Sequence, residues 1–278
     1  MPNSSRRKLI SRIMMGLTTS SAIFVIVILF LILAYILAGG LRYLSFDFLI
    51  NTPKPVGEPH SGIANGIVGS TIMVGFASII GIPVGILAGL YLAESEHHKM
   101  VGVVRFFIDS LIGIPSILIG VFAWTVFVHP MGHFSGFAGG MALAIMMTPI
   151  IARTTEEMIR LVPMELREAA LALGAPRWRV SIGVVLRTSA SGIATGCMLA
   201  IARVAGETAP LLFTALGYDF INTNLNKQMG SLTAQIYYYA GSPYEDWHAM
   251  AWSATLVLIS VIFFLNIAVK LVVRNRHA

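Results

Sequence analysis

Long stretches without a charged side chain are the feature that most limits how this chain can fold. Two of them run from Ile13 to Leu41 and from Ile63 to Ala93. A helix of about 20 apolar residues is long enough to cross the hydrocarbon core of a bilayer. The first stretch is also far longer than the apolar core of about 7–15 residues found in a cleavable signal peptide. We therefore predict an integral membrane protein that retains its first helix.

Three further apolar regions complete the predicted membrane domain. Phe106 to Ala152 contains a single charge, Asp109, and is too long for one span, so we expect two helices separated at His129–His133 (HPMGH). The other two regions cover Ser189–Leu212 and Ala249–Val269. Together these patterns predict an all-α integral membrane fold with six transmembrane helices.

The distribution of positive charge predicts how the helices are oriented. Of the 19 Lys and Arg residues, 15 lie in segments that a six-helix arrangement places on one side, whereas the opposite side has Arg42, Lys54 and Lys227. Because cytoplasmic loops are enriched in Lys and Arg, both termini are predicted to be cytoplasmic. The net charge of +6 is then explained by Lys and Arg residues in the cytoplasmic loops, so no nucleic-acid partner is predicted. We divide the chain into a cytoplasmic segment, 1–12, and one transmembrane domain, 13–278, with a cytoplasmic loop at 153–188.

Small residues and prolines modify two of these helices. Gly81, Gly85 and Gly89 repeat every four residues, so they share one helical face and permit close approach of another helix. Pro83 lies between them and is expected to kink the helix. In the third helix, the segment Gly113–Pro115 is expected to loosen the cytoplasmic end.

The cytoplasmic loop contains a helix-turn-helix pattern in MELREAALALGAPRWRV. Met164–Leu173 is rich in helix formers and carries acidic side chains in its early turns, where the helix dipole favours them. Gly174 is a helix-ending signal, and Pro176 prevents the helix from continuing. A second short helix is expected over Arg177–Leu186. The pattern suits either a compact basic knob at the membrane surface or a solvated loop between two spans.

This segment resembles the EAA loop of ABC-importer permeases. Glu168, Ala169 and Ala170 are followed after three residues by Gly174, as in that family, whereas Arg187 occupies a position where the family usually has proline. The resemblance implies that the knob fits a cleft in a separate ATPase subunit, with these four residues coupling the two proteins. No GxxxxGK[ST] motif occurs in the chain, so ATP and Mg would be held by that partner and not by this protein. The chain itself is accordingly predicted to be neither an enzyme nor a cofactor carrier.

Arg203 and Glu207 are two charges within the predicted fifth helix. A spacing of four residues places both on one helical face, and a charge at membrane depth needs partners. They form either a structural ion pair or a polar step on a substrate path. On such a path Arg203 would attract an anion, and Thr208 would add a hydroxyl group.

Two longer stretches resemble the permease family of phosphate-specific ABC importers (the PstA family). ARVAGETAPLLFTALG, beginning at Ala202, is similar to the family's fifth helix, and IDSLIGIPSILIG, at Ile108–Gly120, to its third. The resemblance implies a type I (MetI-like) permease in the bacterial inner membrane that forms part of an ATP-driven channel for inorganic phosphate. It also implies three kinds of partner: a second homologous permease, two P-loop ATPase subunits and an external phosphate-binding protein. The alternatives are a permease for another oxyanion (sulfate, molybdate or phosphonate) and a scaffold or phosphate-sensing subunit without its own path.

The remaining polar residues are interpreted structurally. Asp109 is expected to form a polar cap or an interhelical hydrogen bond near the cytoplasmic end. His129 and His133 are interpreted as loop residues, because Pro130 disturbs the helical spacing and no third metal ligand is nearby, so no metal site is predicted. The tyrosines of QIYYYAG and Trp247 suggest an aromatic belt in contact with lipid, or part of an external docking surface.

Overall fold

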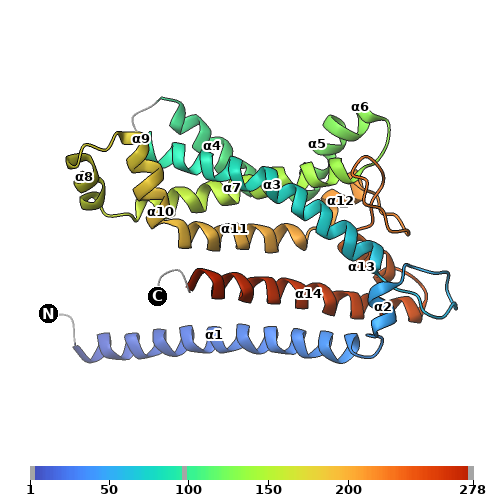
Figure 1. The fold of residues 1–278 in the computed structure, drawn as a ribbon. Helices are drawn as coiled ribbons and strands as arrows, with labels where there is room; N and C mark the ends of the chain where they lie inside the picture. The colour runs from blue at the N-terminus through green and yellow to red at the C-terminus, as the bar shows by residue number, and fades with distance from the viewer. Residues whose placement is uncertain (1–3, 96–98, 275–278) are drawn as a thin grey trace.

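The computed structural model describes residues 4–95 and 99–274, and the chain forms a bundle of long and broken helices (Figure 1). The predicted segment 1–12 and the predicted domain 13–278 therefore lie partly outside the described residues. The continuous helices long enough to span a membrane are α1 (Ser4–Gly40), α3 (Ala64–Glu94), α7 (Gly136–Arg160) and α14 (Glu245–Arg274). Two bent helix pairs raise the number of candidate spans from four to six, the number predicted, if each pair crosses the membrane as one span.

The first bent pair is formed by α4 (Met100–Gly113) and the segment from Ser116 to Met131. The chain bends by 107° between them. The latter comprises α5 (Ser116–Ala123), the π-helical turn η1 (Trp124–Val128) and α6 (His129–Met131). The residue before a proline avoids the helical region, and Ile114 is indeed extended (φ −72°, ψ 130°), so the helix stops at Gly113. The sequence predicted only a loosened helix end here, and the bend is much larger.

The second bent pair connects the knob to a membrane helix. The chain bends by 68° between its two parts, near Ser189. On the knob side are α8 (Met164–Ala172), α9 (Arg177–Val180), the π-helical turn η2 (Ser181–Val185) and α10 (Leu186–Thr188). On the membrane side are α11 (Ala190–Ala205) and, after a break, α12 (Ala209–Thr214). Arg187 is exposed and helical, so the chain turns two residues later than the position at which the family has proline.

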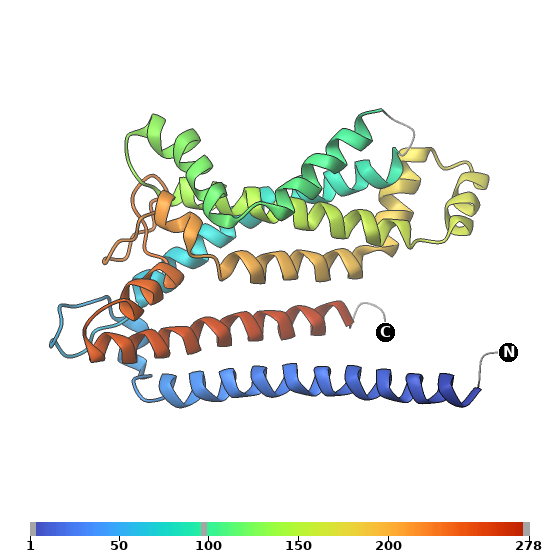
Figure 2. The ribbon, with the colours of Figure 1, turned by 180° about the vertical axis from the view of Figure 1, so that it is seen from behind.

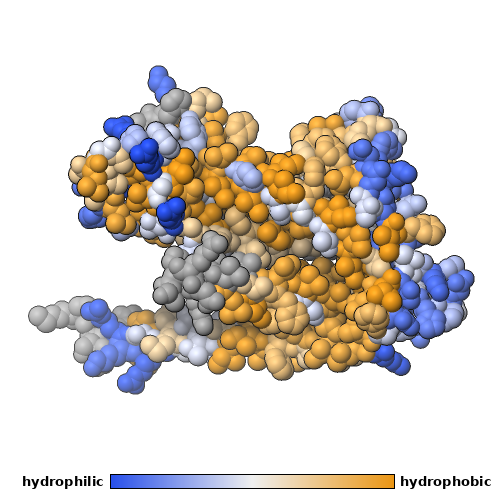
Figure 3. All heavy atoms as spheres, in the orientation of Figure 1, coloured by the Kyte–Doolittle hydropathy of each residue, from blue (hydrophilic) through white to orange (hydrophobic). Residues whose placement is uncertain are grey.

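The short helices α2 (Phe46–Ile50) and α13 (Leu232–Ala240) lie at the end of the bundle opposite α8 and α9. Both views show the first turns of α1 and the last turns of α14 at the end of the bundle where α8 lies (Figures 1 and 2). This matches the prediction that both termini are on the side of the Arg-rich loop. Apolar residues form a band between two more hydrophilic ends (Figure 3), as expected for a protein surrounded by lipid.

The core lies where α3 packs along α7, with α11 and α12 on α7 as well. Gly81, Gly85 and Gly89 are buried on this contact, which confirms the predicted close approach. A Cβ atom at Gly85 would lie 2.7 Å from Cβ of Ile151, and one at Gly89 would lie 2.5 Å from the carbonyl oxygen of Ala152. α3 continues through Pro83 as one helix. By contrast, α1 packs on α14 alone among its major contacts and leaves most of its surface to lipid.

We expect Gly89→Ala to destabilise the protein by about 1–3 kcal/mol, because the new methyl group overpacks the contact between α3 and α7. Gly75→Ala is the matched control, since it lies on the same helix and its Cβ would meet no atom within 4 Å. Thermal unfolding of the detergent-solubilised protein checks this. Equal melting temperatures for the two variants would contradict the packing argument.

Candidate functional site

The knob that the sequence predicts to be cytoplasmic is a helix-turn-helix formed by α8 and α9. Gly174 has a φ of +81°, a conformation that glycine adopts without strain, and its amide donates to the carbonyl of Leu171 at 2.9 Å. Glu168, Ala169 and Gly174 are exposed and Ala170 is half-buried. The structure thus brings together the four residues that the EAA resemblance marks as coupling residues, although it does not test that role.

The outer surface of the knob also exposes large apolar side chains. Leu173 is 89% exposed and Trp178 is 62% exposed. Such residues at a hydrophilic end of the molecule have no lipid to cover them, and clustered exposed apolar groups mark interaction surfaces. The surface is therefore chemically suited to a protein partner.

A polar link fixes the knob to the end of α3. Glu94, the last residue of α3, accepts hydrogen bonds from Nη1 of Arg167 at 2.5 Å and from Oγ of Ser181 at 2.7 Å. Arg167 belongs to α8 and Ser181 begins η2, so one carboxylate joins both arms of the knob to a membrane helix. The side chains of Arg167 and Glu94 are 18% and 24% exposed, which limits screening by water. This link cannot be read from the sequence alone, since it joins residues far apart in the chain.

The last turns of α7 contain a buried carboxylate surrounded by three arginines. Glu156 is 2% exposed and pairs with Arg105 of α4 at 2.7 Å, with Arg160 at 3.0 Å and with Arg153 at 3.3 Å. Arg153 also reaches Glu157 at 3.1 Å. Burying a carboxylate is costly unless charged groups and hydrogen bonds compensate it, and here several do. The cluster therefore attaches α4 to α7.

This cluster corrects one boundary of the sequence analysis. The expected loop began at residue 153, but α7 continues to Arg160. Arginines three residues before and four residues after Glu156 are a helical ion-pair pattern that the sequence already contained. Asp109 lies 4.0 Å from Arg153, so it faces α7 near the cytoplasmic end, in line with the predicted interhelical contact.

Arg203 and Glu207 do not share a helical face, so that part of the prediction is wrong. α11 ends at Ala205, and the non-helical segment Gly206–Thr208 separates it from α12. The cause is Pro210, whose ring would clash with the carbonyl group four residues earlier if one helix continued. Among the described residues, neither charged side chain has a hydrogen bond or an ion pair, and the predicted structural ion pair is not formed. The predicted coupling residues and the predicted path residues also lie apart. The knob precedes the first residue of α11, whereas Arg203 and Glu207 lie at the other end of that helix.

The break nevertheless places these residues at a distinctive position. Arg203 lies in the last turn of α11, where the helix dipole favours a cation, and its side chain is exposed. It is about 20 Å along the helix from Ala190, at a rise of about 1.5 Å per residue. The backbone carbonyl of Glu207 accepts a hydrogen bond from Thr233 of α13 at 2.8 Å. Thr208 precedes α12 and is half-buried.

No cluster of three or more His, Cys, Asp or Glu side chains that could hold a metal ion occurs in residues 4–95 and 99–274. His129 lies in α6 beside Trp124, and His133 contacts the carbonyl of Phe134. The candidate sites therefore consist of a docking knob, charged links at the cytoplasmic end and a broken helix within the membrane. None of these arrangements is suited to bond-breaking chemistry in this chain.

Comparison with known proteins agrees with this description. Residues 81–277 match the family model described as binding-protein-dependent transport system inner membrane component. The fold is similar to a solved inward-facing structure of the MetNI methionine ABC transporter, with a TM-score of 0.61, 20% identity, and coverage of 77% of this chain and 94% of that one. The fold and the family model together define a multi-pass permease component of an inner-membrane ABC importer, which is not itself an enzyme.

Two relatives narrow the assignment. The chain is 42% identical to the phosphate transport system permease protein PstA of Haemophilus influenzae, over 97% of this chain and 96% of the relative. It is 42% identical to PstA of Pasteurella multocida, over 95% of each chain. The chain belongs to the PstA family of permeases.

We expect Glu156→Gln to destabilise the protein by about 2–4 kcal/mol, because it leaves three arginines without their shared charge partner. Glu157→Gln is the matched control, since its side chain is 55% exposed and, among the residues that the structure describes, pairs with Arg153 alone; it should cost less than about 1 kcal/mol. Thermal unfolding of the purified protein distinguishes the two. A Glu156→Gln variant as stable as Glu157→Gln would show that the cluster does not hold α4 on α7.

Proposed function

We propose that this chain is a transmembrane channel subunit of an ATP-driven importer of inorganic phosphate. The observation that carries the proposal is the 42% identity to PstA permeases over nearly the whole chain. The working complex would contain a second homologous permease, two P-loop ATPase subunits and an external phosphate-binding protein. The exposed apolar residues of the knob support the ATPase contact, because they are at the end of the bundle that carries the Arg-rich loop.

The helix break between α11 and α12 supports a path for an anion. Non-helical backbone at membrane depth is tolerated only where protein covers it or water reaches it. An exposed arginine at the same depth is likewise costly against lipid, so Arg203 should face a second subunit or an aqueous path. In the proposed mechanism Arg203 attracts phosphate, while Glu207 and Thr208 lie at the point where the helix direction changes.

Coupling would run from the knob to the membrane helices through two connections. One is the continuous chain from α9 through α10 into α11. The other is the Glu94 link, which joins the knob to α3 and thereby to α7. We infer that ATP-driven closure of the ATPase subunits moves the knob and opens the path outward, and that hydrolysis returns it inward. Glu94 and Arg167 would act as positioning residues in this motion.

Phosphate uptake by the reconstituted complex tests the proposed function. Proteoliposomes with ATP inside and binding protein outside should take up labelled phosphate, and excess unlabelled sulfate should not compete. Arg203→Gln should lower uptake about tenfold, equivalent to about 1.4 kcal/mol, whereas Arg203→Lys should retain part of it because the charge remains. Uptake abolished by sulfate, or absent from an assembled complex, would overturn the substrate assignment. Normal uptake by the Arg203→Gln variant would contradict the proposal that Arg203 lies on the phosphate path.

A charge exchange tests the Glu94 link. Glu94→Arg and Arg167→Glu should each raise the number of ATP molecules hydrolysed per phosphate several-fold, because the knob can then move without α3. The double variant should recover coupling, with an interaction free energy of about 1 kcal/mol or more. Glu165→Arg reverses a charge on the same helix without touching the pair and serves as the control. Failure of the double variant to recover, with the complex assembled, would contradict the positioning role.

A further inference from the structure

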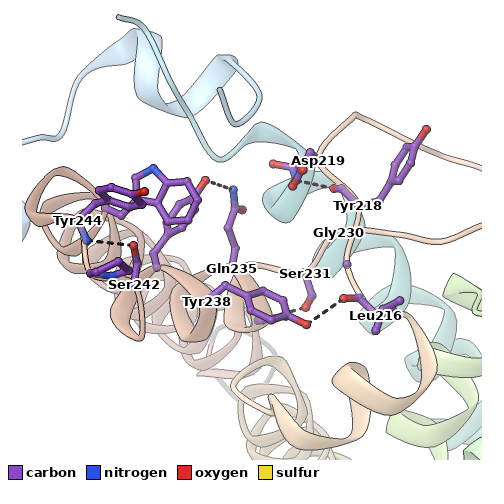
Figure 4. A pocket seen from close by; sticks show the side chains of 15 residues that line it. Leu216, Tyr218, Asp219, Gly230, Ser231, Gln235, Tyr238, Ser242 and Tyr244 are labelled. Atoms are coloured by element: carbon purple, nitrogen blue, oxygen red, sulfur yellow. Dashed lines mark hydrogen bonds between the residues drawn. The ribbon is translucent and has the colours of Figure 1, made fainter. Parts of the chain in front are cut away.

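A cavity of about 460 Å³ lies at the end of the bundle opposite the knob. Its walls come from the loop at 216–219, from Gly230 and Ser231, from α13 and from the start of α14 (Figure 4). The volume is within the usual range of ligand pockets, about 300–1,000 Å³. The proposed phosphate path does not use these residues, so the cavity needs its own explanation.

Two buried amide side chains on the cavity wall have unused acceptor oxygens. Asn65 and Gln235 are 4% and 8% exposed. Their amide nitrogens are occupied, because Asn65 donates to the carbonyl of Tyr218 at 2.6 Å and Gln235 donates to the hydroxyl of Tyr239 at 3.1 Å. Oδ1 of Asn65 and Oε1 of Gln235 have no hydrogen-bond partner among the described residues. A buried acceptor without a donor is unfavourable, and both oxygens are closed off from the cavity in this structure, so a donor of a ligand reaches them only after the two side chains turn.

The charge of the cavity favours a cationic ligand. Asp219 is the one charged side chain among the described residues that line it; neither Lys nor Arg is among them. Asp219 is exposed and has no described ion pair, and Figure 4 shows it across the cavity from Tyr244, with Gln235 between them. Burial raises the pKa of the Tyr239 hydroxyl, its hydrogen bond with Gln235 lowers that pKa, and the charge of Asp219 raises it. Phosphate, an anion, does not suit a cavity whose one charged side chain among the described lining residues is a carboxylate.

Aromatic rings provide the third wall. The ring of Trp247 lies 5.0 Å from that of Tyr239 and 5.8 Å from that of Tyr244, measured between centroids. The faces of such rings carry negative potential and attract ammonium and guanidinium groups, most strongly when the cation is shielded from water. Rings, a carboxylate and unused acceptor oxygens together form a receptor for a cationic hydrogen-bond donor.

We propose that this cavity receives a lysine or arginine side chain of the external binding protein. The family is binding-protein-dependent, and the cavity is at the end of the bundle predicted to be external, where that protein must dock. Arginine and lysine supply the donors and the positive charge that the cavity lacks. The inference rests on the proposed function for the identity of the partner, but the cavity would serve docking and not phosphate passage.

Affinity measurements on the assembled complex in nanodiscs test the docking role. Asp219→Asn should raise the Kd for the binding protein about five- to tenfold, and Tyr244→Ala should have an effect of similar size. Tyr244→Phe keeps the ring face and should bind like the wild type. Glu245→Gln removes a neighbouring exposed charge that does not line the cavity, and serves as the matched control. The effect of Asp219→Asn should shrink at high salt, because screening weakens an ionic contact.

Photo-crosslinking identifies the occupant. A photoreactive phenylalanine analogue at Tyr244 should crosslink to a peptide of the binding protein that contains a surface lysine or arginine. Crosslinks confined to the second permease or to lipid would overturn the proposal, as would unchanged Kd values in both Asp219→Asn and Tyr244→Ala. Phosphate uptake by the same purified wild-type complex, reconstituted into proteoliposomes, separates the two failures. Normal uptake with unaffected binding refutes the cavity's role alone, whereas absent uptake refutes the importer.

Discussion

The close contact between α3 and α7 is the interaction on which the rest of the structure depends. Lipid provides no hydrophobic driving force between helices, so their association relies on tight packing and polar contacts. Gly85 and Gly89 allow the backbones to approach until a single added methyl group would overlap the facing helix. α7 in turn supports α4, α5, α11 and α12. The broken helices can therefore be irregular because their neighbour is continuous.

The charged groups at the cytoplasmic end divide into two assemblies with different roles. Glu156 and its arginines lie within the bundle and hold α4 on α7. Glu94 joins the knob to α3, beside the hydrogen bond from Arg167 to the carbonyl of Ile159 and the packing of Val180 in the core. The first assembly holds the membrane helices together as a rigid body, and the second attaches the knob to that body. A transport subunit driven by a separate motor needs both, since motion of a knob on a loose bundle would be lost as local deformation.

Sequence patterns predicted the helices and the knob well because these depend on local properties. Uncharged runs, the glycine repeat and the Gly174–Pro176 signal each act within a few turns of chain. The large bend at Pro115 was underestimated, since the angle depends on how α4 and α5 separately pack on α7. The Arg203–Glu207 pair was misplaced because spacing was considered without Pro210. Asn65 and Gln235 could not be found from the sequence, since their unused oxygens become evident only when α3 and α13 meet.

The exposure of Arg203 has a consequence for how the cell makes this protein. A single copy released into the bilayer would hold an uncompensated guanidinium group beside an interrupted helix, at a depth where lipid solvates neither. Such a copy would be less stable than the assembled form and would expose a feature that membrane quality-control proteases can reach. In the proposed complex, balanced synthesis of this chain and of the subunit that covers Arg203 then becomes a condition for accumulation of either, and the supply of one sets the abundance of the whole transporter.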